Sequence, residues 1–521
     1  MKKPHIIILA CGKATRLLPI HNNNYPKLLC NAGTKTIMER ILESQPIYRK
    51  RTIVVNNKQY YMQLLTYLKL IGIDDVNVVC LKDGGTSTHD DLKLFIQGES
   101  EHDFDDVILT WSDIMPKKIY DLRGVNFKNN VIFTDTNPRH RYNASNNTIE
   151  HRPLQDGNVV GLYFIKNLLD FINPNDYPYG LDVIDIFKDR DFDTIEVPFH
   201  DLGDVDKYTE FISHEDISAR FFNKLTIYPN EVLKCAKNDM GKSIINREGD
   251  YYEHIKGTQA GEVFPELIER DSDYAIMLKR VLGHTIYDYI LWYGDVNHKD
   301  YELAHRLIGM FKNNIDKLHN SSSHSLTKEE ITSATGIEYY ASVIERLKKV
   351  NNLIPNVTNV NGIDVSFAEV VYHILPELRT RLCDEFKFIH GDTNTTNVMI
   401  TDNKEIKLID PRGHFGGVPY YGDPNYDHAK FLYGLSGYDV FNLTADVRYT
   451  YSNGEIWFED NFGYDLDKLT NDTKLKYLVG ICWLKLPLYT INNLNKATIA
   501  YAKGMQMVTK YGKQLLIELN N

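Results

Sequence analysis

The 521-residue chain has little that would mark a secreted, membrane-spanning or nucleic-acid-binding protein. Its six cysteines, at positions 11, 30, 80, 235, 383 and 482, form no Cys-x-x-Cys pair and no zinc-ligand spacing. We therefore expect reduced thiols in a cytoplasm. No apolar run approaches the length of a membrane span. A formal net charge of -11 argues against a nucleic-acid partner, whereas single nucleotides remain suitable ligands.

The N-terminal stretch MKKPHIIILACGKATR also lacks the long apolar region and the small-residue cleavage site of a signal peptide. A hydrophobic content of 43% and a charged content of 25% are typical of a soluble globular protein. Because 521 residues exceed one ordinary domain, we expect two or three domains.

The most informative segment is FIHGDTNTTNVMITDNKEIKLIDPRG, residues 388–413. It predicts two apolar strands joined by a polar loop, with Asp392 and Asn397 in the loop region and Asp410 ending the second strand. Phosphoryl transfer to a hydroxyl needs one carboxylate that takes the proton, and an amide and a second carboxylate that hold magnesium. Asp and Asn are also common in hairpin turns. Three polar roles at these offsets favour a catalytic loop.

The form His-Gly-Asp-x4-Asn followed by Ile-Asp-Pro-Arg-Gly resembles the aminoglycoside phosphotransferase and choline kinase families. The resemblance implies ATP as donor, Asp392 as the catalytic base, and Asn397 and Asp410 as magnesium ligands. The segment YGDPNYDHAK resembles the GDPxYDLA segment of these families, and there Asp427 would brace the catalytic loop. We interpret His390 as a structural partner of the loop.

A strand and a helix upstream complete this kinase resemblance. Val232-Leu233-Lys234 resembles the strand that supplies a kinase's phosphate-binding lysine, and Glu248 would be its partner on the next helix. Lys237 is the competing candidate, and a lone strand lysine is usually only a solvated edge residue. No G-x-G-x-x-G precedes Lys234, which argues against a protein kinase.

A second motif follows the apolar strand IIILA at residues 6–10. It consists of CGKATRLLP at residues 11–19 and YPKLL at residues 25–29. A basic, Gly-containing loop after a strand can bring N–H groups and cations to a triphosphate. The pair resembles the LAAGxGTRLxP and PKxL signature of sugar-phosphate and phosphocholine nucleotidyltransferases. On that resemblance the residues that act on the nucleotide are Arg16 and Lys27, as catalytic groups, and Gly12 and Lys13.

Later segments resemble the same family in the same order. Gly85 and Thr86 resemble the Gly-Thr turn that approaches the nucleotide base. Asp113, after the strand VILT, and Asp201, in HDLGDVDKY, stand where the family has magnesium ligands. In IEHRPLQDGNVVGLYFIK, two positions are candidates for binding the phosphorylated acceptor: Arg152, in place of the usual Lys, and Gly161.

Two departures from this family pattern bear on activity. Ala14 replaces the Gly of GTR, and Ser112 precedes Asp113 where a Gly is usual. The alternative is a Rossmann-like domain that has kept its fold and lost its catalysis. Asp113 and Asp201 would then be ordinary turn or cap residues.

The resemblances predict two domains. Residues 1–212 should form a Rossmann-like, doubly wound, mainly parallel α/β nucleotidyltransferase domain. Residues 213–521 should form a bilobal, protein-kinase-like α+β domain, with an N-lobe over about 213–282 and a C-lobe over about 283–521.

The two chemistries are consecutive, and we expect a bifunctional enzyme that uses Mg2+. ATP would phosphorylate a small alcohol, and a second NTP, CTP or another, would react with the product and release pyrophosphate. Such activated precursors commonly feed surface-polysaccharide synthesis. The rivals are a kinase with a non-catalytic nucleotide-binding domain, and a scaffold with two degenerate sites. The alcohol is a sugar, a polyol or a choline-like cation, for which Trp292, Trp457 and Trp483 could form an aromatic cage.

Overall fold

The computed structural model of the chain forms two compact units. The first unit comprises Met1–Ile217, Lys349–Pro355 and Thr490–Asn495, and the second comprises Ser218–Lys348, Asn356–Tyr489 and Lys496–Asn521. The sequence did not predict that two short later segments belong with the first unit. The residues described are 3–12, 15–21, 23–45, 47–82, 84–85, 87–98, 104–117, 128–136, 142–145, 147–151, 157–172, 180–213, 223–271, 274–293, 299–322, 326–444 and 447–521.

The first unit is built on a mixed sheet in the order β10-β9-β11-β6-β1-β4-β5, in which β8 joins β11 and β12 joins β8. Its strands are β1 (His5–Leu9), β4 (Lys50–Val55), β5 (Val76–Cys80), β6 (Val107–Trp111), β8 (Asn130–Asp135), β9 (Asn143–Ser145), β10 (Thr148–Glu150), β11 (Asn158–Ile165) and β12 (Phe192–Glu196). All five residues of β1 are buried, as the apolar run in the sequence predicts for a central strand.

The sheet is less parallel than the sequence predicted. β1 pairs in parallel with β4 and β6, and β4 pairs in parallel with β5. β11, however, runs antiparallel to both β6 and β8. A parallel neighbour needs a crossover connection, usually a helix, and the described residues between β6 and β11 form no helix.

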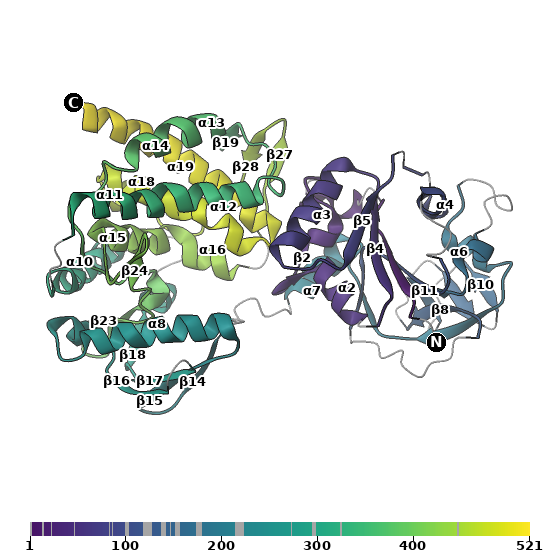
Figure 1. Cartoon of the computed structure of the whole chain (residues 1–521), viewed down its shortest axis with the longest axis horizontal. Helices are drawn as coiled ribbons and strands as arrows, with labels where there is room; N and C mark the ends of the chain where they lie inside the picture. Colours follow the sequence, from purple (N-terminus) through teal and green to yellow (C-terminus); the bar gives the residue numbers. More distant parts are fainter. Residues whose placement is uncertain are drawn as a thin grey trace. The chain divides into compact units, whose positions relative to one another are not determined.

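Helices cover both faces of this sheet, with α2 and α3 on one side and α4 and α6 on the other (Figure 1). The helices are α2 (Ile37–Ser44), α3 (Lys58–Leu70), α4 (Thr88–Gly98), α5 (Leu168–Phe171), α6 (Val183–Phe187) and α7 (Val205–Ser213). α2 begins with a capping box, in which Thr36 accepts from Glu39 N and Glu39 accepts from Thr36 N.

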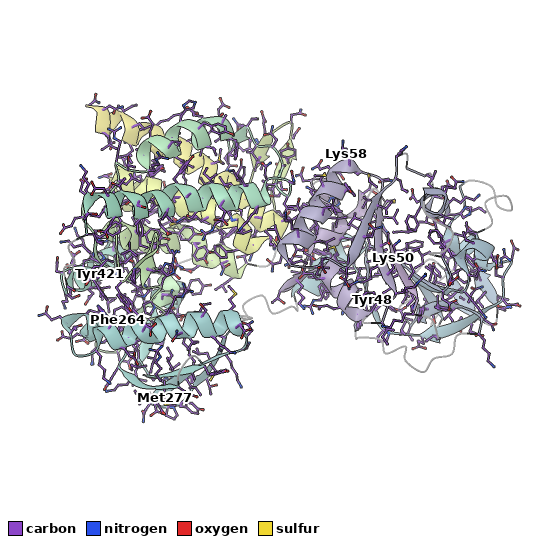
Figure 2. All side chains as sticks on the ribbon, in the orientation of Figure 1. Tyr48, Lys50, Lys58, Phe264, Met277 and Tyr421 are labelled. Carbon is purple, nitrogen blue, oxygen red and sulfur yellow. The ribbon has the colours of Figure 1, made fainter. Side chains whose placement is uncertain are left out.

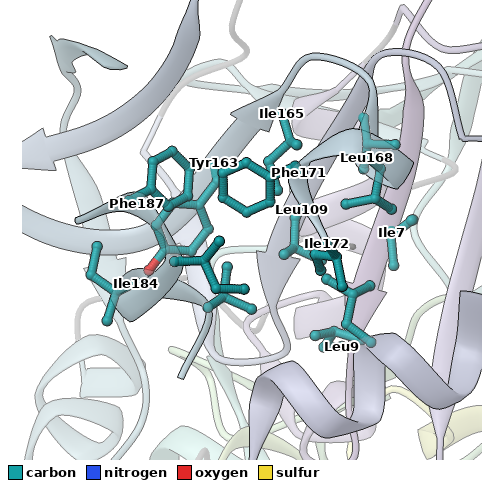
Figure 3. Packing of buried hydrophobic residues seen from close by; sticks show 14 of the residues in the cluster. Ile7, Leu9, Leu109, Tyr163, Ile165, Leu168, Phe171, Ile172, Ile184 and Phe187 are labelled. Atoms are coloured by element: carbon teal, nitrogen blue, oxygen red, sulfur yellow. The ribbon is translucent and has the colours of Figure 1, made fainter. Parts of the chain in front are cut away.

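An apolar cluster fills the space between β1, β6, β11 and the short helices (Figure 3). Ile7 and Leu109 from the central strands meet the aromatic rings of Tyr163, Phe171 and Phe187. The Phe171 and Phe187 ring centroids lie 4.7 Å apart in an edge arrangement. This core holds the strand ends that carry the candidate catalytic residues.

The second unit contains a small antiparallel sheet in the order β14-β15-β17-β16 with the long helix α8 against it (Figure 1). These elements are β14 (Asn223–Ile227), β15 (Glu231–Ala236), β16 (Leu267–Asp271), β17 (Ala275–Lys279) and α8 (Asp239–Ile255). Asn238 caps α8 by accepting from Gly241 N at 2.9 Å.

The rest of the second unit is mainly helical and includes the hairpin that follows the candidate catalytic loop. The hairpin strands are β22 (Val398–Thr401) and β23 (Ile406–Leu408), and β18 (Gly283–Thr285) pairs with β22. The main helices are α9 (Ile286–Tyr293), α10 (Tyr301–His319), α11 (Lys328–Gly336), α12 (Ser342–Val350), α15 (Pro424–Tyr433), α16 (Asp439–Leu443), α18 (Thr473–Lys485) and α19 (Leu494–Asn520). Within the described ranges, none of the helices has both the length and the hydrophobicity of a membrane span.

Candidate active sites

The first candidate site lies where β6 of the first unit ends. Asp113 lies two residues after the end of β6 and directly precedes the short strand β7 (Ile114–Pro116). Lys27 starts the 3-10 turn η2 (Lys27–Leu29), and its ammonium donates to Asp113 Oδ2 at 2.6 Å. Both side chains are largely buried, with 12% and 13% exposed. The structure thus joins two residues that lie 86 positions apart.

Asp201 is brought to the same place by a two-stranded pairing. It ends β13 (Phe199–Asp201), which runs antiparallel to β7, and Leu202 N donates to the Asp113 carbonyl at 2.9 Å. A Cβ on Gly203 would lie 2.9 Å from Asp201 Oδ1 and 3.0 Å from Asp113 Oδ2. Both carboxylates therefore converge over Gly203, and a side chain there would crowd them.

Cations surround this pair of carboxylates. Arg16, in η1 (Thr15–Leu17), is exposed, and one of its terminal nitrogens would lie 3.4 Å from a Cβ on Gly203. Burial raises the pKa of the Asp113 carboxyl, but Lys27 and Arg16 outweigh that effect and bring its pKa below the usual value. The Asp113 carboxylate is therefore ionised near neutral pH, as a ligand of a hard cation must be.

Lys207, which the sequence analysis did not single out, is part of this site. It lies in the first turn of α7 and forms an ion pair with Asp201, and its ammonium also lies 3.4 Å from Asp204 Oδ2. It precedes Tyr208 in the segment HDLGDVDKY, so the motif that identified Asp201 contained it. Oxygen ligands from two carboxylates are the donor set that Mg2+ prefers, so the residues present fit this ion.

The glycines assigned to this site have different surroundings. A Cβ on Gly12 would meet nothing within 4 Å, whereas one on Gly85 would lie 2.5 Å from Asp90 Cβ. Gly85 N donates to Asp91 Oδ1 at 2.8 Å, which fastens the turn to the start of α4. Gly161 has a φ of +85°, and a Cβ there would lie 2.1 Å from Trp111 Cδ1. Packing thus requires glycine at both 85 and 161, and the left-handed φ requires it at 161 as well.

Three residues predicted for this site lie outside the described residues, and nothing is assigned to them from the structure. They are Lys13, Thr86 and Arg152.

The second candidate site lies in the second unit, where β15, α8 and the end of β23 meet. Lys234 donates to Glu248 Oε1 at 2.6 Å and Oε2 at 2.7 Å, and it also forms an ion pair with Asp410. Lys234 is buried, whereas Lys237 lies beyond the end of the strand with its side chain exposed. The geometry favours Lys234 over Lys237 for the lysine role.

Asp410 has an unusual backbone. Its φ is +59°, a left-handed conformation that non-glycine residues rarely adopt. Such conformations persist only where the surrounding structure imposes them, and they are concentrated at functional sites. The turn directs the carboxylate toward Lys234, which supports the sequence interpretation of Asp410 as a site residue.

Asp392 and Asn397 are also in contact. Asn397 Nδ2 donates to the Asp392 carbonyl at 2.8 Å and lies 3.3 Å from Asp392 Oδ2. Asp392 Oδ1 is held more strongly, by Lys430 at 2.8 Å and by Asn394 Nδ2 at 3.1 Å. The less tightly bound oxygen, Oδ2, is therefore the better candidate to accept a proton from a hydroxyl.

Asp427 braces the loop that carries Asp392. Its carboxylate accepts from His390 N at 3.0 Å and from Gly391 N at 2.7 Å, and His319 Nε2 lies 3.1 Å from it. His390 Nε2 in turn lies 2.8 Å from the Ile409 carbonyl. The ring of Phe264, labelled in Figure 2, stacks on the His390 ring with centroids 5.7 Å apart. Burial lowers the pKa of His390, so the ring is neutral at physiological pH. This arrangement supports a structural role for His390.

Sequence reasoning missed several charged residues near Asp392. Arg412 lies 3.1 Å from Glu338 on the helix after α11, and Lys485 of α18 lies 2.6 Å from the same carboxylate. Burial raises the pKa of Glu338, but Lys485 and Arg412 reverse the effect and hold it well below its usual range. Arg412 stands in the segment IDPRG, yet its acidic partner Glu338 comes from a helix that no motif identified.

Trp457 and Trp483, two of the tryptophans that could contribute to an aromatic cage, have different surroundings. Trp483 is fully buried, and Lys503 lies 4.5 Å from its ring centroid. Trp457 lies on β28 (Glu455–Trp457) with 52% of its surface exposed. The side chain of Trp292 lies outside the described residues. Trp483 is therefore a core residue that already has a cationic partner.

A comparison with known family models and with curated protein sequences gives no match. Solved structures resemble the N-terminal part of the chain. A nucleoside-diphosphate-sugar pyrophosphorylase from Vibrio cholerae has 13% identity and a TM-score of 0.33, and the match covers 40% of this chain and 100% of that one. CTP:phosphocholine cytidylyltransferase from Streptococcus pneumoniae has 18% identity and a TM-score of 0.33, with 40% and 97% covered.

An inositol-1-phosphate CTP transferase from T. maritima has 12% identity and a TM-score of 0.33, with 41% and 96% covered. These proteins are nucleotidyltransferases. At this level of similarity the likeness assigns no activity to the chain, and the function must be argued from the residues of the two sites.

Proposed function

We propose that the chain is a bifunctional enzyme that phosphorylates a small alcohol with ATP and then couples the product to a nucleoside triphosphate. The observation that carries the proposal is the convergence in the second unit of Lys234, Glu248 and Asp410, together with the contact between Asp392 and Asn397. A phosphoryl-transfer site needs one cation for the donor phosphates, acidic and amide ligands for magnesium, and a carboxylate at the acceptor.

In the kinase unit, Lys234 would bind the ATP phosphates, and Glu248 holds the ammonium in place. Asn397 and Asp410 would hold Mg2+, which neutralises phosphate charge when it is bound. Asp392 Oδ2 would accept the proton of the acceptor hydroxyl as its oxygen attacks the terminal phosphorus of ATP, while the bond from that phosphorus to the bridging oxygen breaks and ADP leaves. Alignment and charge stabilisation supply most of the acceleration in such a site.

In the first unit, Arg16 and Lys27 would bind the phosphates of a second nucleoside triphosphate. Asp113 and Asp201 would hold Mg2+ at the same place, since both carboxylates face Gly203. The phosphomonoester made by the kinase unit would attack the α-phosphorus, and pyrophosphate would leave. The product is a nucleoside-diphosphate-linked alcohol, a form of precursor suited to surface-polysaccharide synthesis.

An alternative is a kinase whose first unit binds nucleotide without catalysis. The convergence of Asp113, Asp201 and Lys27 favours the bifunctional proposal, because a purely binding domain has no need for two paired carboxylates beside the phosphate-binding cations.

Two matched variants of the full chain test the division of labour. Asp392→Asn should lose ATP-dependent phosphorylation of the alcohol and keep pyrophosphate release from a supplied phosphomonoester. Asp113→Asn should do the reverse. Both reactions are measured across a panel of alcohols and each NTP, with the exposed Asp402→Asn as control. Loss of both activities in either variant would contradict the division, and no pyrophosphate with any NTP would leave the kinase-only alternative.

A further inference from the structure

Lys430 occupies the place beside the candidate catalytic base. It lies on α15, seven residues after the Asp423 that caps this helix, and its ammonium lies 2.8 Å from Asp392 Oδ1. Only 14% of the Lys430 side chain is exposed. Burial lowers the pKa of this ammonium, but Asp392 outweighs that effect and raises it well above the usual value. The site therefore contains a fixed positive charge of its own.

Aromatic faces next to Asp392 are already paired with this ammonium. Lys430 Nζ lies 5.2 Å from the ring centroid of Tyr433 and 5.8 Å from that of Tyr438, and the two rings stack with centroids 4.3 Å apart. Rings at such distances attract a cation over their faces. A quaternary ammonium substrate would have to compete with Lys430 for these faces.

The neighbouring charges reinforce this bias. Burial raises the pKa of Asp392, but Lys430 outweighs that effect and lowers it, and Arg412 contributes in the same direction. Asp439, a further carboxylate at this loop, is buried and accepts from Thr395 N at 2.9 Å and from Thr396 Oγ1 at 3.3 Å. The Asp439 carboxylate is thus hydrogen-bonded within the loop, whereas the Lys430 ammonium contacts the candidate base Asp392 directly.

We propose that Lys430 determines the acceptor class, so that the alcohol phosphorylated by the second unit is uncharged or anionic and carries no cationic group near its reacting hydroxyl. This inference rests on the proposed kinase function and selects sugars, polyols and acidic alcohols over choline-like and amino alcohols. A cationic group next to the reacting hydroxyl would lie close to the Lys430 ammonium, and like charges close together in a partly buried site repel strongly. A hydroxyl oxygen or a carboxylate of the substrate, in contrast, can accept a hydrogen bond from the Lys430 ammonium.

The test compares acceptors that share a shape and differ in charge. The full-length protein is assayed for phosphorylated product with choline and 3,3-dimethylbutan-1-ol, with glucosamine, glucose and glucuronate, and with a panel of further sugars and polyols. We expect the highest kcat/KM for a neutral or anionic acceptor, at least tenfold above its cationic counterpart. A cationic alcohol as the best acceptor would overturn the inference and leave the kinase function intact. Phosphorylation of no alcohol at all would overturn both.

Two variants then assign the selectivity to the residue. Lys430→Met should shift the ratio of kcat/KM for the cationic and neutral members of a matched pair at least tenfold toward the cation. Lys430→Arg keeps the charge and should keep the ratio. An unchanged ratio in Lys430→Met would overturn the role of Lys430, because a merely structural residue would lower both rates alike. If Lys430→Met melts below the assay temperature, Lys430→Gln is compared in the same way, and the wild-type ratios remain decisive.

Discussion

The Lys234 ammonium donates hydrogen bonds to both carboxylate oxygens of Glu248, at 2.6 Å and 2.7 Å. Both side chains are buried, and the same ammonium pairs with Asp410. Glu248 and Asp410 outweigh the effect of burial and keep the pKa of Lys234 above its usual value. The lysine is therefore charged and held between the helix α8 and the end of β23.

Glu248→Gln should weaken the contact with Lys234 while it keeps nearly the same side-chain volume. The amide offers one acceptor in place of two charged oxygens, so Lys234 should turn toward Asp410 and away from the ATP phosphates. We expect the KM for ATP to rise and kcat to fall, with kcat/KM lower by roughly 10- to 100-fold. Steady-state phosphorylation assays check this, with the exposed Lys237→Met as control. Wild-type kinetics in Glu248→Gln would rule out the assigned pair.

Asp427→Asn should destabilise the second unit. The carboxylate accepts from two backbone N–H groups, of His390 and Gly391, and an asparagine would set its own NH2 group against one of them. A buried donor that loses its acceptor, and a broken network of this kind, cost about 2–4 kcal/mol. Urea unfolding followed by tryptophan fluorescence measures the loss. The exposed Asp402→Asn should change stability by less than about 0.5 kcal/mol.

Much of each site could be predicted from the sequence, because the residues concerned lie at strand ends in short motifs. Asp113 and Asp410 each lie two residues beyond the end of a strand, β6 and β23, so the local pattern placed them near strand ends. The sequence wrongly put Asp410 at the end of its strand, because its left-handed turn leaves no signal in the apolar pattern. Asp427 was identified by its segment in the same way, and its hydrogen bonds to the loop support that prediction.

The residues that the sequence did not predict contact partners that are distant in the sequence. Lys430 reaches Asp392 from a helix that begins 32 positions later, and Glu338 meets Lys485 across 147 positions. From the sequence alone, a lysine on a helix among apolar residues is expected to bury its stem and keep its ammonium in water. Only the tertiary packing shows that it has a buried partner. The antiparallel β11 was missed for a related reason, since strand direction depends on the partner and not on the strand's own residues.

Gly161→Ala should destabilise the first unit. The left-handed φ of +85° disfavours any side chain, and a Cβ would lie 2.1 Å from Trp111 Cδ1. We expect a loss of at least about 2 kcal/mol and a lower thermal midpoint by calorimetry. Gly98→Ala, where a Cβ meets nothing within 4 Å, is the matched control and should leave the midpoint unchanged or raise it. An equal effect at both positions would contradict the packing argument.

Lys207→Met should change the magnesium requirement of the nucleotidyl transfer. Lys207 forms an ion pair with Asp201, so a metal ion that binds this carboxylate has to compete with the ammonium. Removal of the lysine should lower the magnesium concentration for half-maximal rate by roughly 3- to 10-fold. Titration of pyrophosphate release against magnesium measures this, with the exposed Lys166→Met as control. A higher requirement in Lys207→Met would show that the lysine assists the site in another way.

Lys496 should make the stability of the second unit depend on alkaline pH. Its ammonium donates to the Asn442 carbonyl at 2.7 Å, and burial lowers the pKa of Lys496 to about 8 from an ordinary value of 10.5. Between these values the unfolded chain binds the proton and the folded chain does not, so this group adds stability as the pH rises. The contribution is complete above pH 10.5, is lost as the pH falls through 8, and amounts to at most about 3 kcal/mol.

Tyrosines titrate in the same range, so the measured quantity is the difference in unfolding free energy between wild type and Lys496→Met. Between pH 8 and 10 the unfolding free energy of the wild type should rise relative to that of Lys496→Met. A constant difference would show that Lys496 keeps its proton in the folded protein.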